Sequence, residues 1–203
     1  MSTSSQLQVR KVAEADFPTE YGHFRIHGFE GRRGAHREEA VVLAMGDLSS
    51  PVLVRIHSQC LTGDVFHSLR CDCRAQLELA LETIAAEGRG MVIYEEKEGR
   101  GIGLLNKLRA YQLQDAGADT VDANEQLGFG ADLREYELPG AILHHFSISS
   151  VRLMTNNPEK ISALETVGVQ VAERVPCQPP ARAHHSNRYL KTKKKRMGHL
   201  LEL

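Results

Sequence analysis

The sequence predicts an α+β fold, a single compact domain of mixed sheets and packed helices. Three observations carry this prediction. The chain has 203 residues, which is enough for one substantial core. Runs rich in β-branched residues occur together with stretches whose apolar residues recur at helical spacing. The strands and helices nevertheless lack the regular alternation of a doubly wound sheet. We therefore expect one domain over residues 1–203, with a basic C-terminal segment from about residue 178.

Strands are expected in the first third of the chain. Residues 19–29 and 40–57 have strand composition, and the runs VVLAM at 41–45 and PVLVRIHS at 51–58 supply the β-branched residues. Ser49, Ser50 and Pro51 provide a turn between these two runs.

Helices and further strands follow. Residues 75–87, AQLELALETIAAE, have apolar residues on one helical face, and Gly88 is a suitable C-terminal stop. MVIYE at 91–95 has the composition of a buried strand. Residues 103–116 predict a helix that directs Leu104, Leu105, Leu108 and Tyr111 toward the core.

The last elements are a strand over 151–154, a helix over 158–166 opened by Pro158, and a strand over 169–175. The chain ends in KTKKKRMGHLLEL, a basic segment whose lysines 193–195 are interpreted as a solvated face.

Composition narrows the functional class. Apolar residues make up 41% and charged residues 25%, as in an ordinary globular protein, and the formal net charge of −1 argues against a general nucleic-acid binder. The N-terminus has no apolar secretory core, and no apolar run approaches the length of a membrane span. We therefore expect a cytoplasmic protein with neither a nucleic-acid nor a membrane partner.

The strongest motif is a cysteine cluster. Cys60, Cys71 and Cys73 have the spacing C-x10-C-x-C, and soft thiolates suit Zn²⁺. Three protein ligands and a water are the arrangement of a catalytic zinc. The alternatives are a closed zinc site completed by His57 or His67, and three buried free thiols.

Two segments are candidates for binding phosphate. EGRGIG at 98–103 precedes a helix, and its glycines let backbone N–H groups face an anion. The guanidinium of Arg100 can form two parallel hydrogen bonds to phosphate oxygens. The alternative is a tight strand-to-helix turn. In TNNPEK at 155–160, Lys160 lies in the first helical turn, against the helix dipole. That placement indicates an anionic ligand, and the alternative is an exposed lysine.

Five segments together resemble the GTP cyclohydrolase II family. They are RIHSQCLTGDVFHSLRCDCRAQL, EGRGIGLLNKLRAYQLQD, GADTVDANEQLGFGADLREY, VRLMTNNPEK and RYLKTKKKRMGHLL, in family order over nearly the whole chain. The resemblance implies a homodimeric enzyme for the first step of riboflavin synthesis. It would convert GTP to formate, pyrophosphate and 2,5-diamino-6-ribosylamino-4(3H)-pyrimidinone 5′-phosphate.

The resemblance also implies a set of site residues. One Zn²⁺ per chain would be held by Cys60, Cys71 and Cys73, and Mg²⁺ would accompany the triphosphate. Nucleotide contacts would come from Arg55, Ile56, His57, Ser58, Gln59, Gln76, Glu98, Gly99, Arg100, Thr120, Thr155 and Lys160. Tyr111 would lie near the purine, Asp132 would accept a proton, and Arg134 would attack phosphorus.

Physical chemistry refines three of these roles. Three thiolates lower the Lewis acidity of zinc, because they add negative charge to it. A neighbouring proton donor such as Tyr111 must then assist the ring opening. The Glu98 carboxylate complements the two donors on the Watson–Crick edge of guanine, unless Glu98 is only an exposed turn residue. Arg134 is a poor nucleophile because a guanidinium stays protonated. Electrostatic clamping of the α-phosphate, with Asp132 orienting the arginine, is the easier role.

Three departures from the family pattern keep alternatives open. Gln59 replaces a glutamate, Arg74 replaces a glycine, and both changes add positive character near the metal. Residues 138–150 also look less helical than in the family. One alternative is a paralogue that uses GTP for a secondary metabolite or stops at the formylated intermediate. Another is a zinc-stabilised nucleotide-binding module, against which Asp132, Arg134 and Tyr111 favour an enzyme.

Overall fold

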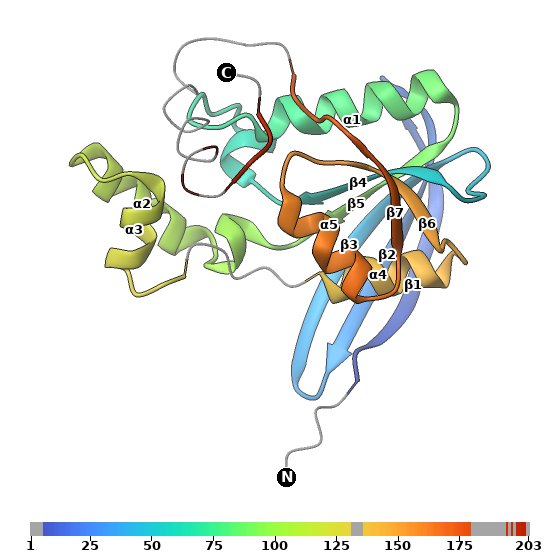
Figure 1. The fold of residues 1–203 in the computed structure, drawn as a ribbon, viewed down its shortest axis with the longest axis horizontal. Helices are drawn as coiled ribbons and strands as arrows, with labels where there is room; N and C mark the ends of the chain where they lie inside the picture. The colour runs from blue at the N-terminus through green and yellow to red at the C-terminus, as the bar shows by residue number, and fades with distance from the viewer. Residues whose placement is uncertain (1–5, 131–135, 180–193, 195, 197, 202–203) are drawn as a thin grey trace.

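A single seven-stranded mixed sheet organises the chain, in the order β1-β2-β3-β5-β4-β6-β7 (Figure 1). The computed structural model describes residues 6–130, 136–179, 194, 196 and 198–201. The strands are β1 (Gln8–Thr19), β2 (Gly22–Arg33), β3 (His36–Met45), β4 (Val52–Ser58), β5 (Gly90–Glu95), β6 (Ser150–Met154) and β7 (Gln170–Val175). The α+β prediction is confirmed, and the predicted strands join in one sheet.

The sheet has an antiparallel half and a parallel half. Strands β1, β2, β3 and β5 pair antiparallel. Strand β4 is parallel to both β5 and β6, and β6 is parallel to β7. The carboxyl ends of β4, β5 and β6 therefore meet at one edge of the sheet.

Helices cover both faces of the sheet. They are α1 (Cys73–Glu87), α2 (Leu104–Asp115), α3 (Thr120–Gln126), α4 (Glu137–His145) and α5 (Pro158–Thr166), with a short π-helix η1 (Leu61–Val65) and a 3₁₀ turn η2 (Glu98–Gly101). Figure 1 shows α2 and α3 as a pair that stands apart from the sheet. No helix in the described part of the chain is both long and apolar enough to span a bilayer.

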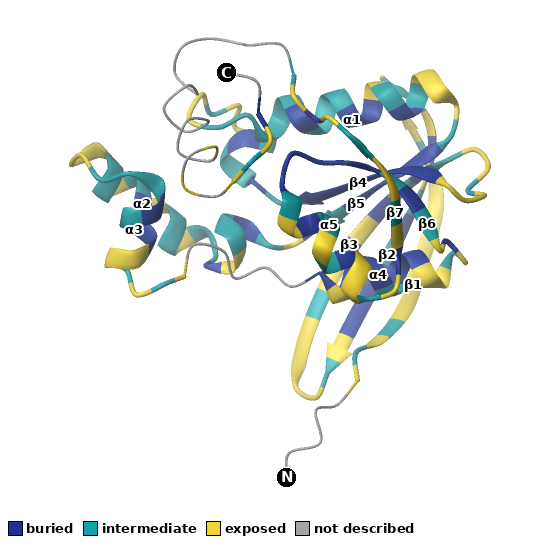
Figure 2. Cartoon of the chain, in the orientation of Figure 1, coloured by how far each residue is buried: buried dark blue, intermediate teal, exposed yellow. Residues whose placement is uncertain are grey.

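Alternating side chains of the central strands fill two cores, and Figure 2 shows the buried parts of the central strands and of the helices in dark blue. In β4, Val54 packs with α4 and α5 residues, whereas its neighbour Leu53 packs with Ile84 of α1. Strand β5 alternates in the same way, with Ile93 in the first core and Val92 in the second. The central strands are thus buried on both faces, as their apolar sequences require.

Most predicted elements are present near their predicted bounds. The helix at 158–166 agrees with α5, and the helix at 75–87 is α1, which begins two residues earlier at Cys73. Gly88 ends α1 in the left-handed conformation at φ 69°, as its role as a stop predicts. The strands at 91–95, 151–154 and 169–175 agree with β5, β6 and β7 to within a residue.

The predicted core face of α2 is wrong in part. Leu105 is 71% exposed and Leu108 is 45% exposed, and within α2 only Ala110 is fully buried. The reason is that α2 packs mainly against α3 and η2 rather than against the sheet. Apolar residues at helical spacing therefore mark a surface here, not the core.

The N-terminal strands and α4 also differ from expectation. The predicted strand at 19–29 spans the turn between β1 and β2, and β1 itself gave no apolar signal because most of it is exposed. Residues 138–150, which looked less helical than in the family, contain all of α4 but its first residue, with Leu138 and Ile142 fully buried. Pro139 is tolerated in its first turn, and Gly140 lets α4 approach Val167 closely.

Candidate active site

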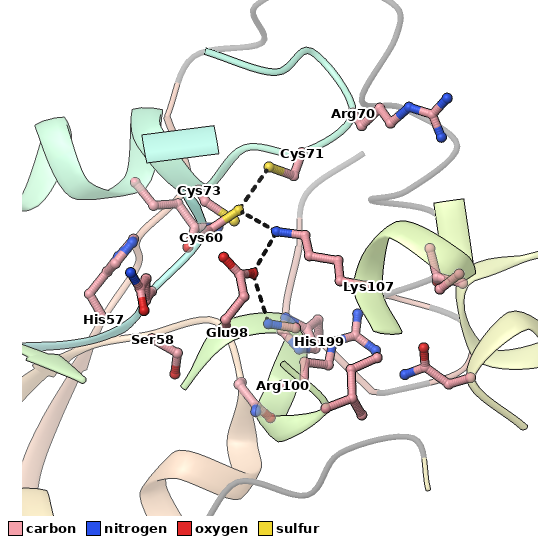
Figure 3. Close-up of a pocket in the computed structure, with 18 of the residues that line it drawn as sticks. His57, Ser58, Cys60, Arg70, Cys71, Cys73, Glu98, Arg100, Lys107 and His199 are labelled. Carbon is pink, nitrogen blue, oxygen red and sulfur yellow. Dashed lines mark hydrogen bonds and ion pairs between the residues drawn. The ribbon is translucent and has the colours of Figure 1, made fainter. Parts of the chain in front are cut away.

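A cavity lies where the carboxyl ends of β4, β5 and β6 meet, the usual place for ligands in sheets of this kind (Figure 3). Its wall contains most of the residues expected to bind the nucleotide. They are Arg55, His57, Ser58, Gln59, Gln76, Glu98, Gly99, Arg100, Thr120, Thr155 and Lys160, and Tyr111 and the three cysteines join them. Ile56 lies in the core beneath the wall, and its carbonyl accepts a hydrogen bond from Lys160. Asp132 and Arg134 lie outside the described residues.

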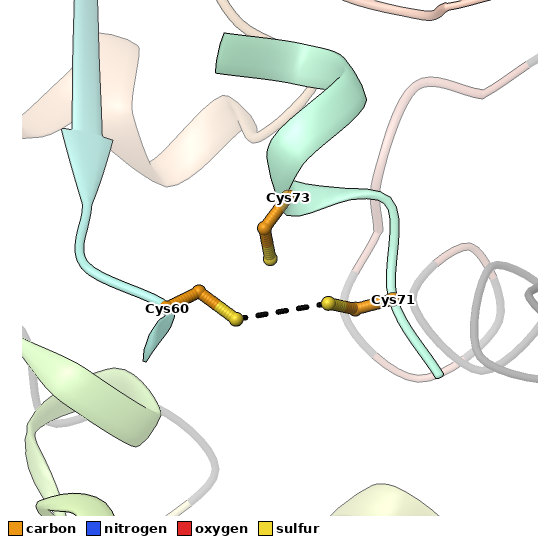
Figure 4. Close-up of side chains that lie close together, drawn as sticks. All are labelled: Cys60, Cys71 and Cys73. Atoms are coloured by element: carbon orange, nitrogen blue, oxygen red, sulfur yellow. Dashed lines mark hydrogen bonds between the residues drawn. The ribbon is translucent and has the colours of Figure 1, made fainter. Parts of the chain in front are cut away.

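The three cysteines gather at one end of the cavity (Figure 4). Cys60 follows β4, Cys73 begins α1, and Cys71 lies in the loop between them. Their Sγ atoms lie within 4.8 Å of one another, and Cys60 and Cys71 are 3.6 Å apart at sulfur. Thiolates around a tetrahedral zinc are separated by roughly 3.8 Å, given Zn–S bonds of about 2.3 Å. The cluster therefore fits a zinc ion.

The two histidines considered as a fourth ligand, and the fourth cysteine of the chain, are engaged elsewhere. His57 Nε2 lies 3.2 Å from an Asp64 oxygen, and exposed His67 contacts Arg74. Cys177 donates to the Gln76 carbonyl from within the α1-side core. Among the described residues, the cluster of possible metal ligands contains the three thiols alone. This arrangement supports a site with an open fourth position.

Gly63 in η1 has no side chain, and the sulfur atoms of Cys60 and Cys71 occupy the space where a Cβ would lie. A Cβ at this position would lie 2.8 Å from Cys71 Sγ and 3.1 Å from Cys60 Sγ. We therefore expect Gly63→Ala to lower the zinc content severalfold while the sheet remains folded. Metal analysis and circular dichroism of the purified protein measure the two effects. Gly28→Ala is the matched control, since nothing lies within 4 Å of its added Cβ. A Gly63→Ala protein with full zinc content would contradict this packing argument.

A buried lysine and glutamate support the cluster from the side. Lys107 Nζ lies 3.1 Å from Cys60 Sγ and 2.7 Å from Glu98 Oε1. Burial lowers the pKa of Lys107, but the carboxylate and the thiolate outweigh it and raise the pKa well above its usual value. Glu98 also accepts from the Leu61 N–H at 2.7 Å and the Gly99 N–H at 2.8 Å. Glu98 is thus a buried anchor between η1 and η2, and the exposed-turn alternative is wrong.

The three thiols share protons unequally. Hydrogen bonds from Cys71 and Cys73 lower the pKa of Cys60, and Lys107 adds to the effect. The same hydrogen bond to Cys60 raises the pKa of Cys71 to about 11, and that of Cys73 also rises. A metal ion must therefore displace protons on binding, and its affinity falls as the pH falls.

Tyr111 stands beside the cluster as a neutral phenol. Burial raises its pKa above the usual value, so the hydroxyl keeps its proton near neutral pH. The hydroxyl lies 3.1 Å from Thr62 Oγ1, and the Arg70 guanidinium stacks over the ring at 4.7 Å. The side chain is held in place and is able to donate a proton.

Two buried cations give the wall its charge. Arg55 is 6% exposed and donates to Gln76 Oε1 at 2.7 Å and to the Met154 carbonyl at 3.0 Å. Both acceptors are neutral, and no carboxylate of the described residues pairs with this arginine. Lys160 is 4% exposed and donates to the Ile56 carbonyl at 2.8 Å, so the exposed-lysine alternative is wrong. Buried positive charge in a cavity wall favours an anionic ligand.

Several polar atoms of the wall are left for a ligand. Arg55 Nε, His57 Nδ1, Thr120 Oγ1 and Asn157 Nδ2 are buried without a hydrogen-bond partner in the described structure. More than about 90% of buried polar groups in native proteins are paired. A bound molecule with several hydrogen-bonding groups would satisfy these atoms.

The segment after β5 is both a tight turn and part of the wall. Gly99 and Arg100 adopt left-handed conformations at φ 62° and φ 64°, which reverses the chain before α2. A Cβ on Gly99 would lie 2.9 Å from Ile102. Glu98, Gly99 and Arg100 nevertheless all face the cavity, so the two interpretations of the glycine-rich segment are compatible.

The sequence did not predict the residues that support the cysteine cluster through hydrogen bonds to Cys60. Asp64 accepts hydrogen bonds from the Cys60 N–H at 3.0 Å and from Tyr94 Oη at 2.9 Å, which fixes the cysteine loop. Lys107 could have been found, because it lies one helical turn before Tyr111 on the same face. Asp64 carried no comparable local signal.

The two departures near the metal differ in position. Gln59 lines the cavity, and its backbone N–H donates to the Glu95 carbonyl. Arg74 does not line it. Its side chain pairs with Glu78 at 2.6 Å and donates to the Asp64 carbonyl at 3.2 Å. Arg74 therefore braces the outside of the cysteine loop.

Comparison with known proteins gives a consistent family match. The model of the family GTP cyclohydrolase II matches residues 10–176. A GTP cyclohydrolase-2 of Saccharophagus degradans is 53% identical over 196 residues, 96% of each chain. A GTP cyclohydrolase-2 of Pseudomonas paraeruginosa is 56% identical over 96% of this chain and 95% of its own. One of Azotobacter vinelandii is 55% identical over 96% and 93% of the two chains.

Proposed function

The chain belongs to the GTP cyclohydrolase II family, and we propose that the cavity at the ends of β4, β5 and β6 is where it hydrolyses GTP. The protein is an enzyme of riboflavin biosynthesis. Its products are formate, pyrophosphate and 2,5-diamino-6-ribosylamino-4(3H)-pyrimidinone 5′-phosphate. The observation that carries the proposal is the meeting, in one cavity, of the three-thiol cluster with the buried cations Arg55 and Lys160.

The end of the cavity that contains the three cysteines binds the purine and carries out the ring opening. Cys60, Cys71 and Cys73 would hold the zinc ion, which would supply the Lewis acidity that makes water a competent nucleophile near neutral pH. Lys107 and Glu98 hold the Cys60 sulfur in position. Neutral Tyr111 donates its phenolic proton to the ring nitrogen that leaves carbon 8 as the imidazole ring opens.

The part of the cavity wall that contains Arg55 and Lys160 binds the triphosphate. Arg55 is fixed by Gln76 and the Met154 carbonyl, so its free Nε can bind an oxygen without losing these contacts. Lys160 is fixed by the Ile56 carbonyl and adds a second charge. Thr120 and Thr155 supply hydroxyl groups nearby, and a Mg²⁺ ion would contribute further positive charge for the triphosphate.

Asp132 and Arg134 act at the α-phosphate in this proposal. Arg134 clamps the phosphate and stabilises charge as pyrophosphate leaves, and Asp132 orients the arginine. Arg134→Lys keeps the charge, so we expect pyrophosphate release to persist at a cost of about 2–4 kcal/mol in activation free energy. Quenched-flow trapping with GTP labelled at the α-phosphate provides the measurement. A labelled covalent adduct in the native protein, absent from Arg134→Lys, would establish a nucleophilic arginine instead.

Assembly and location complete the proposal. The protein forms a homodimer, for which the exposed apolar side chains Phe66, Leu69, Leu105 and Leu108 offer contact surface. It works in the cytoplasm as one domain, where reducing conditions keep the cysteines free for metal.

Product analysis tests the function. The protein is incubated with GTP and Mg²⁺, formate and pyrophosphate are assayed, and the pyrimidine product is identified by mass. We expect both small products in equal amounts from GTP and neither from ATP. A formylated pyrimidine with pyrophosphate but no formate would identify an enzyme that stops at the intermediate. Absence of both products in a zinc-loaded protein would reject the function.

A further inference from the structure

The described part of the C-terminal segment contributes to the cavity through His199, and Figure 1 shows this part in dark red near the end of the chain. His199 belongs to the cavity wall and is drawn in Figure 3 among the other lining side chains. The next residue, Leu200, donates its backbone N–H to the Asn156 carbonyl at 2.9 Å. Leu201 is 5% exposed. We call Arg196 together with residues 198–201 the C-terminal strap.

One end of the strap is held to α3. Arg196 Nη1 lies 3.1 Å from Asp119 Oδ2, and its Nη2 lies 3.2 Å from Asp122 Oδ1. Asp119 is the N-cap of α3, and Thr120, the first residue of that helix, lines the cavity. The ion pairs thus fix the strap to the helix that presents Thr120.

The other end is held to the opposite wall. Asn156 lies in the loop between β6 and α5, beside Thr155, and it also lines the cavity. Its side chain exchanges two hydrogen bonds with the Cys177 backbone, at 2.7 Å and 3.0 Å. This rigid residue provides the carbonyl that holds Leu200. The strap therefore bridges two walls of the cavity, and His199 lies between its two attachments.

We propose that the C-terminal strap is part of the nucleotide site and that His199 contacts the bound GTP. The inference rests on the proposed function for the identity of the ligand. The attachment to α3 is of a kind that can open when GTP enters. Arg196 is 44% exposed at its side chain, and ion pairs of that exposure are individually weak. The strap can therefore leave and return during turnover, and bound GTP adds the contact with His199 that favours the closed position.

Steady-state kinetics test the role of His199. We expect His199→Ala to raise KM for GTP about tenfold, the effect of one lost hydrogen bond to a charged ligand, with a smaller change in kcat. His23→Ala is the matched control, because His23 is an exposed histidine of β2 that pairs with Asp16 and does not line this cavity. If His199→Ala impairs folding, His199→Gln preserves a polar side chain of similar size and should give an intermediate KM. Unchanged KM in a folded His199 variant would overturn the inference.

Charge reversal tests the attachment to α3. Arg196→Glu places a carboxylate against two others and should raise KM for GTP. Asp122→Arg in the same chain should restore part of the loss, since Asp122 is exposed and is not the helix cap. Neither a raised KM nor rescue would be seen if the strap had no part in binding.

Hydrogen exchange separates this inference from the proposed function. The Leu200 amide should exchange faster in Arg196→Glu than in the native protein, whether or not GTP is turned over. Equal exchange of the Leu200 amide in the two proteins would overturn the inference that Arg196 holds the C-terminal strap in place. A native protein that leaves GTP intact but shows the exchange difference would reject the proposed function and leave the strap itself supported.

Discussion

Cys60→Ser is expected to stop formate release from GTP while part of the pyrophosphate release survives. Cys60 lies between the other two thiols and Lys107, so its loss removes the ligand around which the cluster is arranged. Lewis-acid assistance is worth several kcal/mol, and the rate of formate release should fall by about a thousandfold or more. In the proposed function, Arg55 and Lys160 bind the triphosphate, away from the carbon at which formate is released. Separate assays of formate and pyrophosphate measure the two steps.

Two controls protect this result from a folding artefact. Circular dichroism and thermal unfolding show whether the Cys60→Ser chain keeps its structure, because a metal site can also contribute to folding. Cys177→Ser replaces a thiol that lies outside the cluster and should retain zinc and formate release. Undiminished formate release by a folded, metal-free Cys60→Ser protein would contradict a zinc mechanism.

Lys160→Met is expected to separate activity from stability. Lys160 is 4% exposed, and its ammonium group lies 5.6 Å from the Tyr136 ring centroid. Methionine fills similar space without charge. Loss of a charge-assisted contact with the triphosphate should raise KM for GTP by about 10- to 100-fold. The orphaned Ile56 carbonyl costs about 1–3 kcal/mol, which the relief of ammonium desolvation offsets, so the free energy of unfolding should change little.

The matched variant Lys97→Met should show the reverse pattern. Lys97 is partly buried between the Glu38 and Glu95 carboxylates, at 3.0 Å and 3.2 Å, and it does not line the nucleotide cavity. Its loss removes one ion pair from each of these carboxylates, so stability should fall while KM for GTP stays near the native value. Urea unfolding and steady-state kinetics on both variants provide the comparison. A strongly destabilised Lys160→Met protein with native KM would refute an anion-binding role for this lysine.

The sequence predicted those elements whose pattern reflects burial. Helix α1 buries Ala80, Leu81 and Ile84 on one face, and β5 is apolar from Met91 to Ile93 because both of its faces are covered. Strand β1 lies at the sheet edge and is mostly exposed, so it lacks the alternation that identifies a half-buried strand. The apolar residues of α2 were assigned to the core because periodicity shows that a face is apolar, not what it packs against.

The sequence predicted those site residues that belong to a short local motif. The cysteines and the residues of the two phosphate-binding candidates follow the carboxyl ends of β4, β5 and β6, and the sheet brings them together. Asp64 and His199 were missed because their contacts depend on how distant segments pack. Glu98 was found, but its role as an anchor for the Leu61 N–H became visible only from the fold.

The central claim is that the three-thiol cluster, when it holds zinc, opens the imidazole ring of GTP in this cavity. Its most direct test is formate release by metal-free protein to which zinc is added stepwise, with bound zinc measured in parallel. We predict that formate release increases in proportion to bound zinc and reaches its maximum at about one zinc per chain. Formate release at the full rate before any zinc is added would contradict the claim.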